Sequence, residues 1–488
     1  MSSNGTGGQQ FFNEFRKKKR ESFFKRHSKR KLLTWLGLGY LGYYGFFICQ
    51  KPWIETPKTN NADAFQQHLK RNVENFNRRF CPTPWLIHAH LQTVYGAAFR
   101  HVIDDQDEAV MVKQRKQYEF EDGAIINLDW FEPPKASTVA ASSETPRKDT
   151  TIFILPGLSG GTNAVGVKHL IYSFVKAGYR CVVMDYKTST TEEPTTIHGH
   201  HTKKPLVPEG EPIDLDEKPS FFEKTHVIPG LTHGVKDIRN VVQLVRKEIG
   251  QDTRLVGVGF SLGANTLLTY LSHHVGKDAP KNQNAKKLKN QKEILPDDDG
   301  DESRNEFSYA ISIGNPFDLN QATLALQSSL FNKFIYDRSY AEERIKVYER
   351  NKELLTPPYD KILSTVRTTR DMDDLITRHL SVDGTFKTVE EFYEFQSCYN
   401  KLNRITIPTV CLNALDDPIS VYPAIPFEAF VHHDKLMLVT TTRGGHIASL
   451  DGFPWPHNKE TWMERTSVQI VNSMEEWKEG LKKNSRLD

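Results

Sequence analysis

The amino-acid sequence predicts an α/β fold in which helices cover both faces of a mostly parallel, eight-stranded sheet. From the third expected strand onward, short and continuously apolar runs alternate with helical patterns, as a sheet buried on both faces requires. Two strand-like runs of mixed composition precede these repeated units. The expected strands span residues 110–118, 125–132, 150–155, 181–186, 255–260, 309–313, 409–415 and 436–442.

Helical patterns lie between these strands, most clearly over residues 234–249, where apolar side chains recur at helical spacing. A longer, mainly helical stretch at 316–400 separates the sixth strand from the seventh. We expect it to form a cap over the carboxyl edge of the sheet, where such folds bind ligands. Two hydrophilic stretches, at about 188–224 and 276–305, lack the apolar residues needed for packing and are predicted to be mobile insertions.

A membrane anchor is predicted ahead of this region. Residues 32–49 contain no charged side chain, which is the short end of what spans a hydrocarbon core. The dense Lys and Arg run before it predicts a cytosolic N-terminus. We expect a single-pass protein, located in the endoplasmic reticulum or another endomembrane. An anchor lying in the membrane plane is the alternative. The expected order is a basic tail (1–31), the anchor helix (32–49), a connector (50–108) and the sheet domain (109–482).

Charge and cysteine patterns argue against two other classes of function. The net charge is only +3, and the basic side chains gather near the N-terminus, so we expect no nucleic-acid partner. The cysteines form no CxxC pair, and the histidines at 198–201 have no carboxylate or cysteine at ligand spacing. We therefore expect no metal and no other cofactor.

The strongest chemical signal is the motif G-x-S-x-G at residues 259–263, which follows a hydrophobic strand and precedes a helical pattern. This is the context of a nucleophile elbow, a tight turn that presents a serine hydroxyl to the substrate. A side chain at Gly259 or Gly263 would clash with the turn. We therefore predict an α/β-hydrolase fold with Ser261 as the nucleophile.

A serine nucleophile needs a histidine base, and that histidine needs an acid to orient it. In this fold the chain order is serine, acid, histidine. The seventh strand ends at Asp416 and Asp417, and the last strand leads through two glycines to His446. Backbone N–H groups should stabilise the oxyanion, and we assign them to Leu262, after the nucleophile, and Leu158, in the glycine-rich loop after the third strand.

Short motifs spread over residues 81–455 extend this pattern. They are CPTPW at 81–85, HLQT at 90–93, DG at 122–123, LDW at 128–130, LPGL at 155–158, GFSLGAN at 259–265, NPFD at 315–318, LNALDDP at 412–418 and GGH at 444–446. Together they resemble the ABHD family of single-helix membrane-anchored lipases and esterases, which includes medium-chain fatty-acid ethyl ester synthases. The long insertion at 188–224 departs from the short loop usual in that family.

The resemblance implies that Asp417 is the acid, with Asp416 as the second choice. It also implies that the substrate is an acyl ester of a lipid, either a monoacylglycerol, a phospholipid or a medium-chain ester. The sequence thus predicts a membrane-associated serine hydrolase that works through an acyl-enzyme on Ser261. Two alternatives stay open: an acyltransferase or ester synthase using the same acyl-enzyme, and a non-catalytic lipid-binding protein of this fold.

Overall fold

The structure of this chain is a computed structural model that describes residues 17–18, 29, 31–57, 64–100, 112–119, 125–133, 149–158, 161–185, 197–198, 235–273, 306–350, 363–379, 386–457 and 459–484. The chain divides into two units, Met1–Gln50 and Lys51–Asp488, and the sheet lies in the second unit. The predicted insertions at 188–224 and 276–305 lie outside the described residues, except for a two-residue strand at Ile197–His198.

One ten-stranded sheet organises the second unit, with the order β1-β10-β9-β8-β7-β4-β5-β3-β2-β6. Neighbouring strands run parallel from β10 to β5, whereas β3 is antiparallel to both β5 and β2. All eight predicted strands are present, and the mostly parallel sheet is confirmed. The structure adds the short β1 and β6 at the two edges. The bounds are β1 Trp53–Glu55, β2 Val112–Glu119, β3 Ile125–Glu132, β4 Thr150–Leu155, β5 Arg180–Met184, β6 Ile197–His198, β7 Arg254–Phe260, β8 Tyr309–Ile313, β9 Thr409–Ala414 and β10 Leu436–Thr441.

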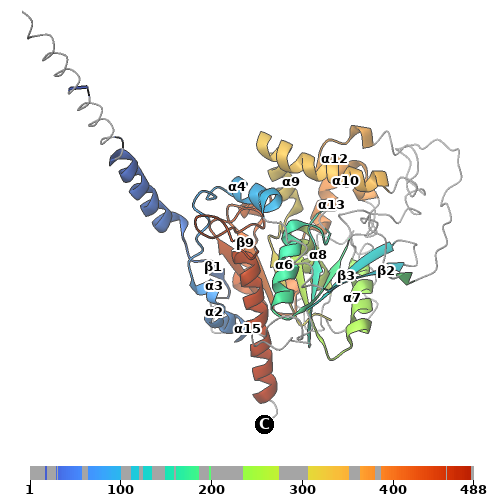
Figure 1. Ribbon diagram of the computed structural model, residues 1–488. Coiled ribbons are helices and arrows are strands. Elements are labelled where there is room, and N and C mark those ends of the chain that lie inside the picture. The colour runs from blue at the N-terminus through green and yellow to red at the C-terminus, as the bar shows by residue number, and fades with distance from the viewer. Residues whose placement is uncertain are drawn as a thin grey trace, which may run out of the picture. The chain divides into compact units, whose positions relative to one another are not determined.

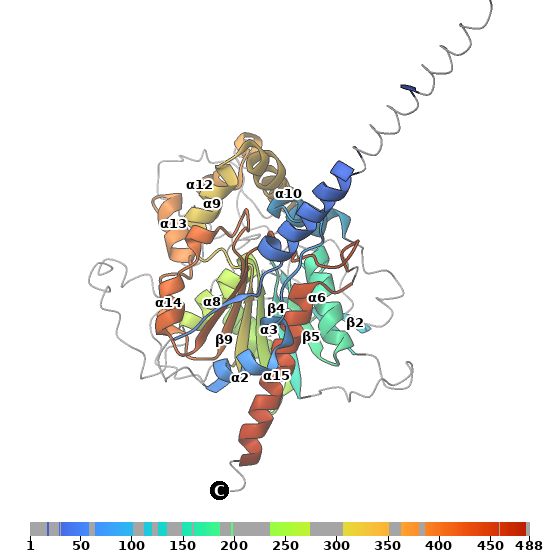
Figure 2. The same ribbon diagram turned by 90° about the vertical axis from the view of Figure 1, so that its left-hand side faces the viewer.

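Helices cover both faces of this sheet because successive strand residues point to opposite sides. In β4, Ile152 and Ile154 pack into the apolar core on one face, and Phe153 and Leu155 pack into the core on the other. The helices on the first face are α2 (Ala64–Asn72), α3 (Glu74–Asn77), α6 (Val165–Lys176) and α15 (Trp462–Asn484). Those on the second face are α7 (Val235–Ile249), α8 (Leu262–His273) and α14 (Phe427–His432), and Figures 1 and 2 show both layers.

A group of helices lies between β8 and β9, where the sequence predicts the cap. Its members are α9 (Leu319–Gln327), η6 (Asn332–Asp337), α10 (Arg338–Arg350), α12 (Thr369–Leu375), η8 (Thr377–His379) and α13 (Val389–Gln396). They gather beyond one end of the sheet, beside α4 (Ala89–Val94), as Figures 1 and 2 show. This is the carboxyl end of the parallel strands, because Ser261 follows β7 there and shares a pocket with α9 and α13.

Residues 51–100, which the sequence assigned to a connector, are instead part of the sheet unit. Strand β1 pairs with β10 in antiparallel register, and α2 and α3 pack against α15. Leu69 and Phe76 are buried in the same apolar core as Ile470. The segment has weak periodicity because its elements are short, and its partners lie more than 300 residues further along the chain.

In the first unit, residues 31–43 are α-helical, and Tyr44–Ile48 forms the π-helix η1. Within the part of the chain that the structure describes, no helix combines the length and the apolar character that a membrane span needs. The spanning helix predicted at 32–49 is therefore not found.

Candidate active site

Ser261 lies at a sharp turn between β7 and α8, with φ of 54°, a left-handed conformation rare for residues other than glycine. Its own N–H donates to the carbonyl of Ile313 in β8 over 2.8 Å, which fixes the turn to the sheet. A Cβ added at Gly259 would lie 2.5 Å from the Cα of Ala264, and one at Gly263 would lie 2.2 Å from the carbonyl oxygen of Leu155. The two glycines are thus required by backbone contacts, as predicted.

Three of the predicted side chains form one hydrogen-bonded chain. The Oγ of Ser261 lies 2.8 Å from Nε2 of His446, and Nδ1 of His446 lies 2.8 Å from Oδ2 of Asp417. The second carboxylate oxygen of Asp417 accepts from the N–H groups of Ile419 and Ser420, at 2.8 Å each. Asp417 and His446 are only 4% and 6% exposed, so little water competes for these bonds.

The neighbouring Asp416 occupies a different place. Its Oδ1 accepts from the N–H of Gly445 at 3.0 Å, and its carboxylate lies 3.9 Å from the guanidinium of Arg443. Burial raises the pKa of Asp416 from 3.8 to about 6. No hydrogen bond joins it to His446 in the described structure. Asp416 therefore holds the loop before His446, while Asp417 contacts the imidazole.

Helix α4 supports that loop from the other side. The N–H of His446 donates to Oγ1 of Thr93 at 2.9 Å, and a Cβ at Gly445 would lie 2.6 Å from the carbonyl oxygen of Ala89. Gln92 exchanges hydrogen bonds with both backbone groups of Leu450, at 3.1 and 2.7 Å. Reasoning from strands and helices missed these residues, although the HLQT motif of the family resemblance contains Gln92 and Thr93.

The two predicted oxyanion donors face the same space as the serine. Leu158 and Leu262 both line the pocket that contains Ser261 and His446. Within the described ranges, neither backbone N–H donates a hydrogen bond to another residue. Gly157 keeps the loop close to the elbow, because a Cβ there would lie 3.1 Å from Cβ of Ser261. Both residues thus lie beside the serine hydroxyl, and their role as oxyanion donors stays a prediction.

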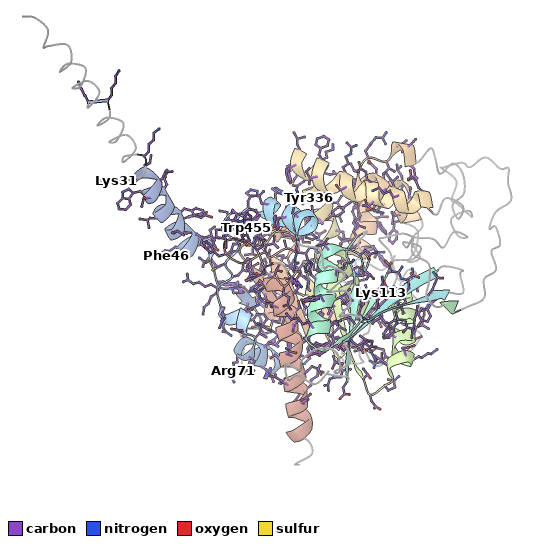
Figure 3. The ribbon with its side chains drawn as sticks, viewed as in Figure 1. Lys31, Phe46, Arg71, Lys113, Tyr336 and Trp455 are labelled. Atoms are coloured by element: carbon purple, nitrogen blue, oxygen red, sulfur yellow. The ribbon has the colours of Figure 1, made fainter. Side chains whose placement is uncertain are left out.

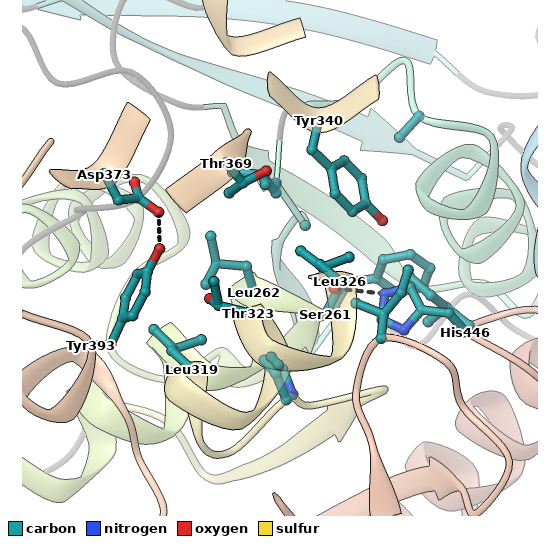
Figure 4. Close-up of a pocket in the computed structure, with 18 of the residues that line it drawn as sticks. Ser261, Leu262, Leu319, Thr323, Leu326, Tyr340, Thr369, Asp373, Tyr393 and His446 are labelled. Atoms are coloured by element: carbon teal, nitrogen blue, oxygen red, sulfur yellow. Dashed lines mark hydrogen bonds between the residues drawn. The ribbon is translucent and has the colours of Figure 1, made fainter. Parts of the chain in front are cut away.

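The pocket above Ser261 is a cavity of about 160 Å³ between the sheet and the cap. Its walls are mostly apolar and include Leu319 and Leu326 of α9 as well as Phe260 and Ile447. Figure 4 shows Ser261 and His446 at one side of it and Tyr393 and Asp373 at the other. Burial, together with the nearby Asp417, raises the pKa of Tyr340, which also lines the cavity.

The cap is joined to α4 close to this pocket. The hydroxyl of Tyr336 in η6 lies 2.9 Å from Nδ1 of His90, and Figure 3 places Tyr336 on the cap. Burial raises the pKa of Tyr336 to about 12.

Among the residues described, no three His, Cys, Asp or Glu side chains are grouped so that they could hold a metal ion.

The strand–serine–helix elbow, the parallel sheet and the order of serine, aspartate and histidine along the chain define an α/β-hydrolase fold. No family model matches the chain. It is 23% identical over 457 residues to human phospholipase ABHD3, covering 94% of this chain and 93% of that protein. The embryogenesis-associated protein EMB8 of Picea glauca is 24% identical over 418 residues, covering 84% of this chain and 76% of its own.

A third relative is the monoacylglycerol lipase ABHD2 of Danio rerio, which is 23% identical over 414 residues and covers 81% of this chain and 78% of its own length. These relatives confirm the resemblance to the ABHD family that the sequence motifs predicted. Among solved structures, the esterase Pf2001 of Pyrococcus furiosus matches with a TM-score of 0.39 and 12% identity, covering 76% of this chain and 97% of its own.

Proposed function

We propose that this chain is a serine hydrolase that cleaves carboxylic esters of lipids through an acyl-enzyme on Ser261. One observation carries the proposal: the hydrogen-bonded chain from Ser261 through His446 to Asp417 stands at a nucleophile elbow and opens into an apolar pocket. A serine without a base would be a weak nucleophile. If the hydrogen bond between Ser261 and His446 only stabilised the fold, it would not need the strained backbone turn at Ser261.

In the proposed reaction, Oγ of Ser261 attacks the ester carbonyl carbon while Nε2 of His446 takes its proton. Asp417 holds the imidazole in the required tautomer and stabilises its positive charge. The N–H groups of Leu158 and Leu262 donate to the oxyanion. His446 then gives the proton to the leaving alcohol. In the second half of the reaction, water attacks the carbonyl carbon of the acyl-enzyme while His446 takes a proton from it. The bond to Oγ of Ser261 breaks, His446 returns the proton to that oxygen, and the fatty acid leaves.

The substrate class follows from the pocket and from the relatives. ABHD3 is named a phospholipase and ABHD2 a monoacylglycerol lipase, so both proteins are named for activity on lipids. The apolar walls from Leu319, Leu326 and Ile447 suit a hydrocarbon chain. The cavity is smaller than the roughly 300–1,000 Å³ of drug-sized ligand sites, which favours a short or medium acyl chain.

A direct test measures decanoic acid released from monodecanoylglycerol and from didecanoyl phosphatidylcholine by the full chain in lipid vesicles. The wild type should release acid from at least one of them, and Ser261→Ala should lower the rate by about 10⁴-fold or more. Ser339→Ala, on the exposed face of α10, is the matched control and should keep the wild-type rate. Release that persists in Ser261→Ala would contradict the proposal. Decanoyl ethyl ester formed in the presence of ethanol would instead identify an ester synthase.

We also propose that residues 32–49 attach the chain to a membrane, with the N-terminus in the cytosol and the endoplasmic reticulum or another endomembrane as the location. Large apolar side chains are exposed along this segment, including Leu33 at 67%, Trp35 at 72% and Phe46 at 77%. Such a row is costly in water and suits lipid. Changing Trp35 and Phe46 to serine should reduce co-flotation with vesicles, and unchanged flotation would contradict this attachment.

A further inference from the structure

The pocket has a second, polar end that the proposed ester cleavage does not use. Figure 4 shows Asp373 and Tyr393 on the far side of the cavity from His446, with Thr323 and Thr369 between them and Ser261. All four side chains line the cavity, and all four come from cap helices. Asp373 and Tyr393 are only 1% and 2% exposed, so their polar atoms meet the cavity rather than bulk water.

The carboxylate of Asp373 at this end is neutralised by the guanidinium of Arg344. Oδ1 of Asp373 accepts from Nη2 of Arg344 at 2.6 Å, and the same nitrogen donates to Oγ1 of Thr377 at 2.6 Å. Oδ2 of Asp373 accepts from the hydroxyl of Tyr393 at 2.7 Å. An ionic ligand group placed here would be a third buried charge without a counter-charge, which costs several kcal/mol.

Hydroxyl groups remain available at this end. The Tyr393 hydroxyl donates its proton to Asp373, and its oxygen accepts a hydrogen bond from Thr323. Oγ1 of Thr369 donates toward Asp337, both to its backbone carbonyl, over 3.4 Å, and to its carboxylate. Burial and the neighbouring Asp373 raise the pKa of Tyr393. The hydroxyl oxygens of the two threonines keep lone pairs, which can accept the proton of an uncharged hydroxyl.

We infer that the Tyr393–Thr323–Thr369 end of the pocket is a subsite that binds an uncharged hydroxyl group of the lipid ester and thereby selects among substrates. The inference rests on the proposed function and adds to it the polar group that the substrate carries. That hydroxyl belongs either to the glycerol part of a monoacylglycerol or to the far end of a hydroxylated acyl chain, since the chemistry at the subsite is the same.

The test compares kcat/KM for three esters of one chain length: methyl decanoate, monodecanoylglycerol and methyl ω-hydroxydecanoate. The wild type should prefer one hydroxylated ester over methyl decanoate, and the preferred ester identifies the source of the hydroxyl. Thr323→Val and Tyr393→Phe should each lower that preference by roughly 3- to 10-fold, the worth of one hydrogen bond. Thr323→Val keeps the side-chain shape and leaves the Asp373–Tyr393 bond in place, so it stays informative if Tyr393→Phe folds poorly.

A purely structural role for the cluster would change the rate on all three esters together and leave the preference unchanged. Tyr179→Phe and Thr253→Val are the matched controls, because each removes a hydroxyl that bonds within the sheet unit far from the pocket, to Asn472 and to the carbonyl of Ile249. If the wild type shows no preference, or the pocket variants keep it, the inference is wrong and ester cleavage stands. If the wild type cleaves none of the three esters, the proposed function fails and the inference fails with it.

Discussion

The two sides of the pocket are built in different ways. On the sheet side, Ser261, Asp417 and His446 each follow the carboxyl end of a parallel strand within a few residues. On the cap side, Leu319, Asp373 and Tyr393 come from three helices joined by side-chain contacts, among them the Asp373–Tyr393 hydrogen bond. The sheet side is fixed by the register of neighbouring strands, whereas the cap side depends on contacts between distant segments. Changes on the sheet side should therefore lower the rate on every ester, and changes on the cap side should alter which ester is preferred.

The largest contrast is expected between the two adjacent aspartates. Asp417→Asn should lower kcat/KM by about 10³- to 10⁴-fold, because it removes the carboxylate that orients the imidazole of His446 and stabilises its positive charge. Asp416→Asn keeps an acceptor for the N–H of Gly445 and should cost less than about 10-fold. Steady-state rates of both variants on monodecanoylglycerol decide the point. A larger loss for Asp416→Asn would reverse the assignment of the acid.

A smaller loss is expected when one oxyanion donor is removed. Leu158→Pro deletes the backbone N–H and should lower kcat by about 10²- to 10³-fold with little change in KM. Leu158→Ala keeps the N–H and trims only the pocket wall, so it serves as the control. Equal effects of the two substitutions would show that the side chain matters and the N–H does not. Circular dichroism of both variants checks that the loop change leaves the fold intact.

The raised pKa of Asp416 predicts a pH dependence of stability on the sheet side. The folded pKa of about 6 lies above the ordinary 3.8, so the folded state holds this proton over a window where the unfolded state has lost it. Stability from this group therefore falls as pH rises from about 4 to 6. The Asp416→Asn variant should lack this pH-dependent loss, which amounts to about 2 kcal/mol in the free energy of unfolding. Urea unfolding of both chains at pH 4 and pH 7 measures it, and parallel curves would contradict the shift.

The smallest effect is expected on the cap side, as a change in chain-length preference. Leu326 lines the cavity from α9, so Leu326→Phe should narrow it and shift the kcat/KM ratio of decanoyl to butyryl esters by about 10-fold toward the shorter chain. Leu330→Phe adds the same bulk at a position that is 75% exposed and outside the cavity. An equal shift in both variants would show that α9 does not form the acyl wall.

The same contrast explains what the sequence could predict. The strands Thr150–Leu155 and Tyr309–Ile313 have the bounds expected from their apolar runs, since a strand buried on both faces leaves a strong local signal. The elbow at Ser261 was equally visible, because its two glycines have a local steric reason. His446 and Asp417 could be placed beside it because strand order brings their loops to one edge.

The features that the sequence did not reveal depend on distant partners. Thr93 and Gln92 act on residues that lie more than 350 positions away, so no local pattern marks them. Strand β1 exists only because it pairs with β10. The spanning helix was expected from an uncharged run alone, and no such helix is found among the described residues.

The central claim is that Ser261 is an activated nucleophile, and labelling with a fluorophosphonate probe tests it most directly. The probe forms a covalent bond with a serine only when a base has removed the hydroxyl proton. Wild type should label, whereas Ser261→Ala and His446→Ala should not, with circular dichroism confirming that all three chains are folded. A folded wild type that stays unlabelled, or a Ser261→Ala variant that still labels, would contradict the account.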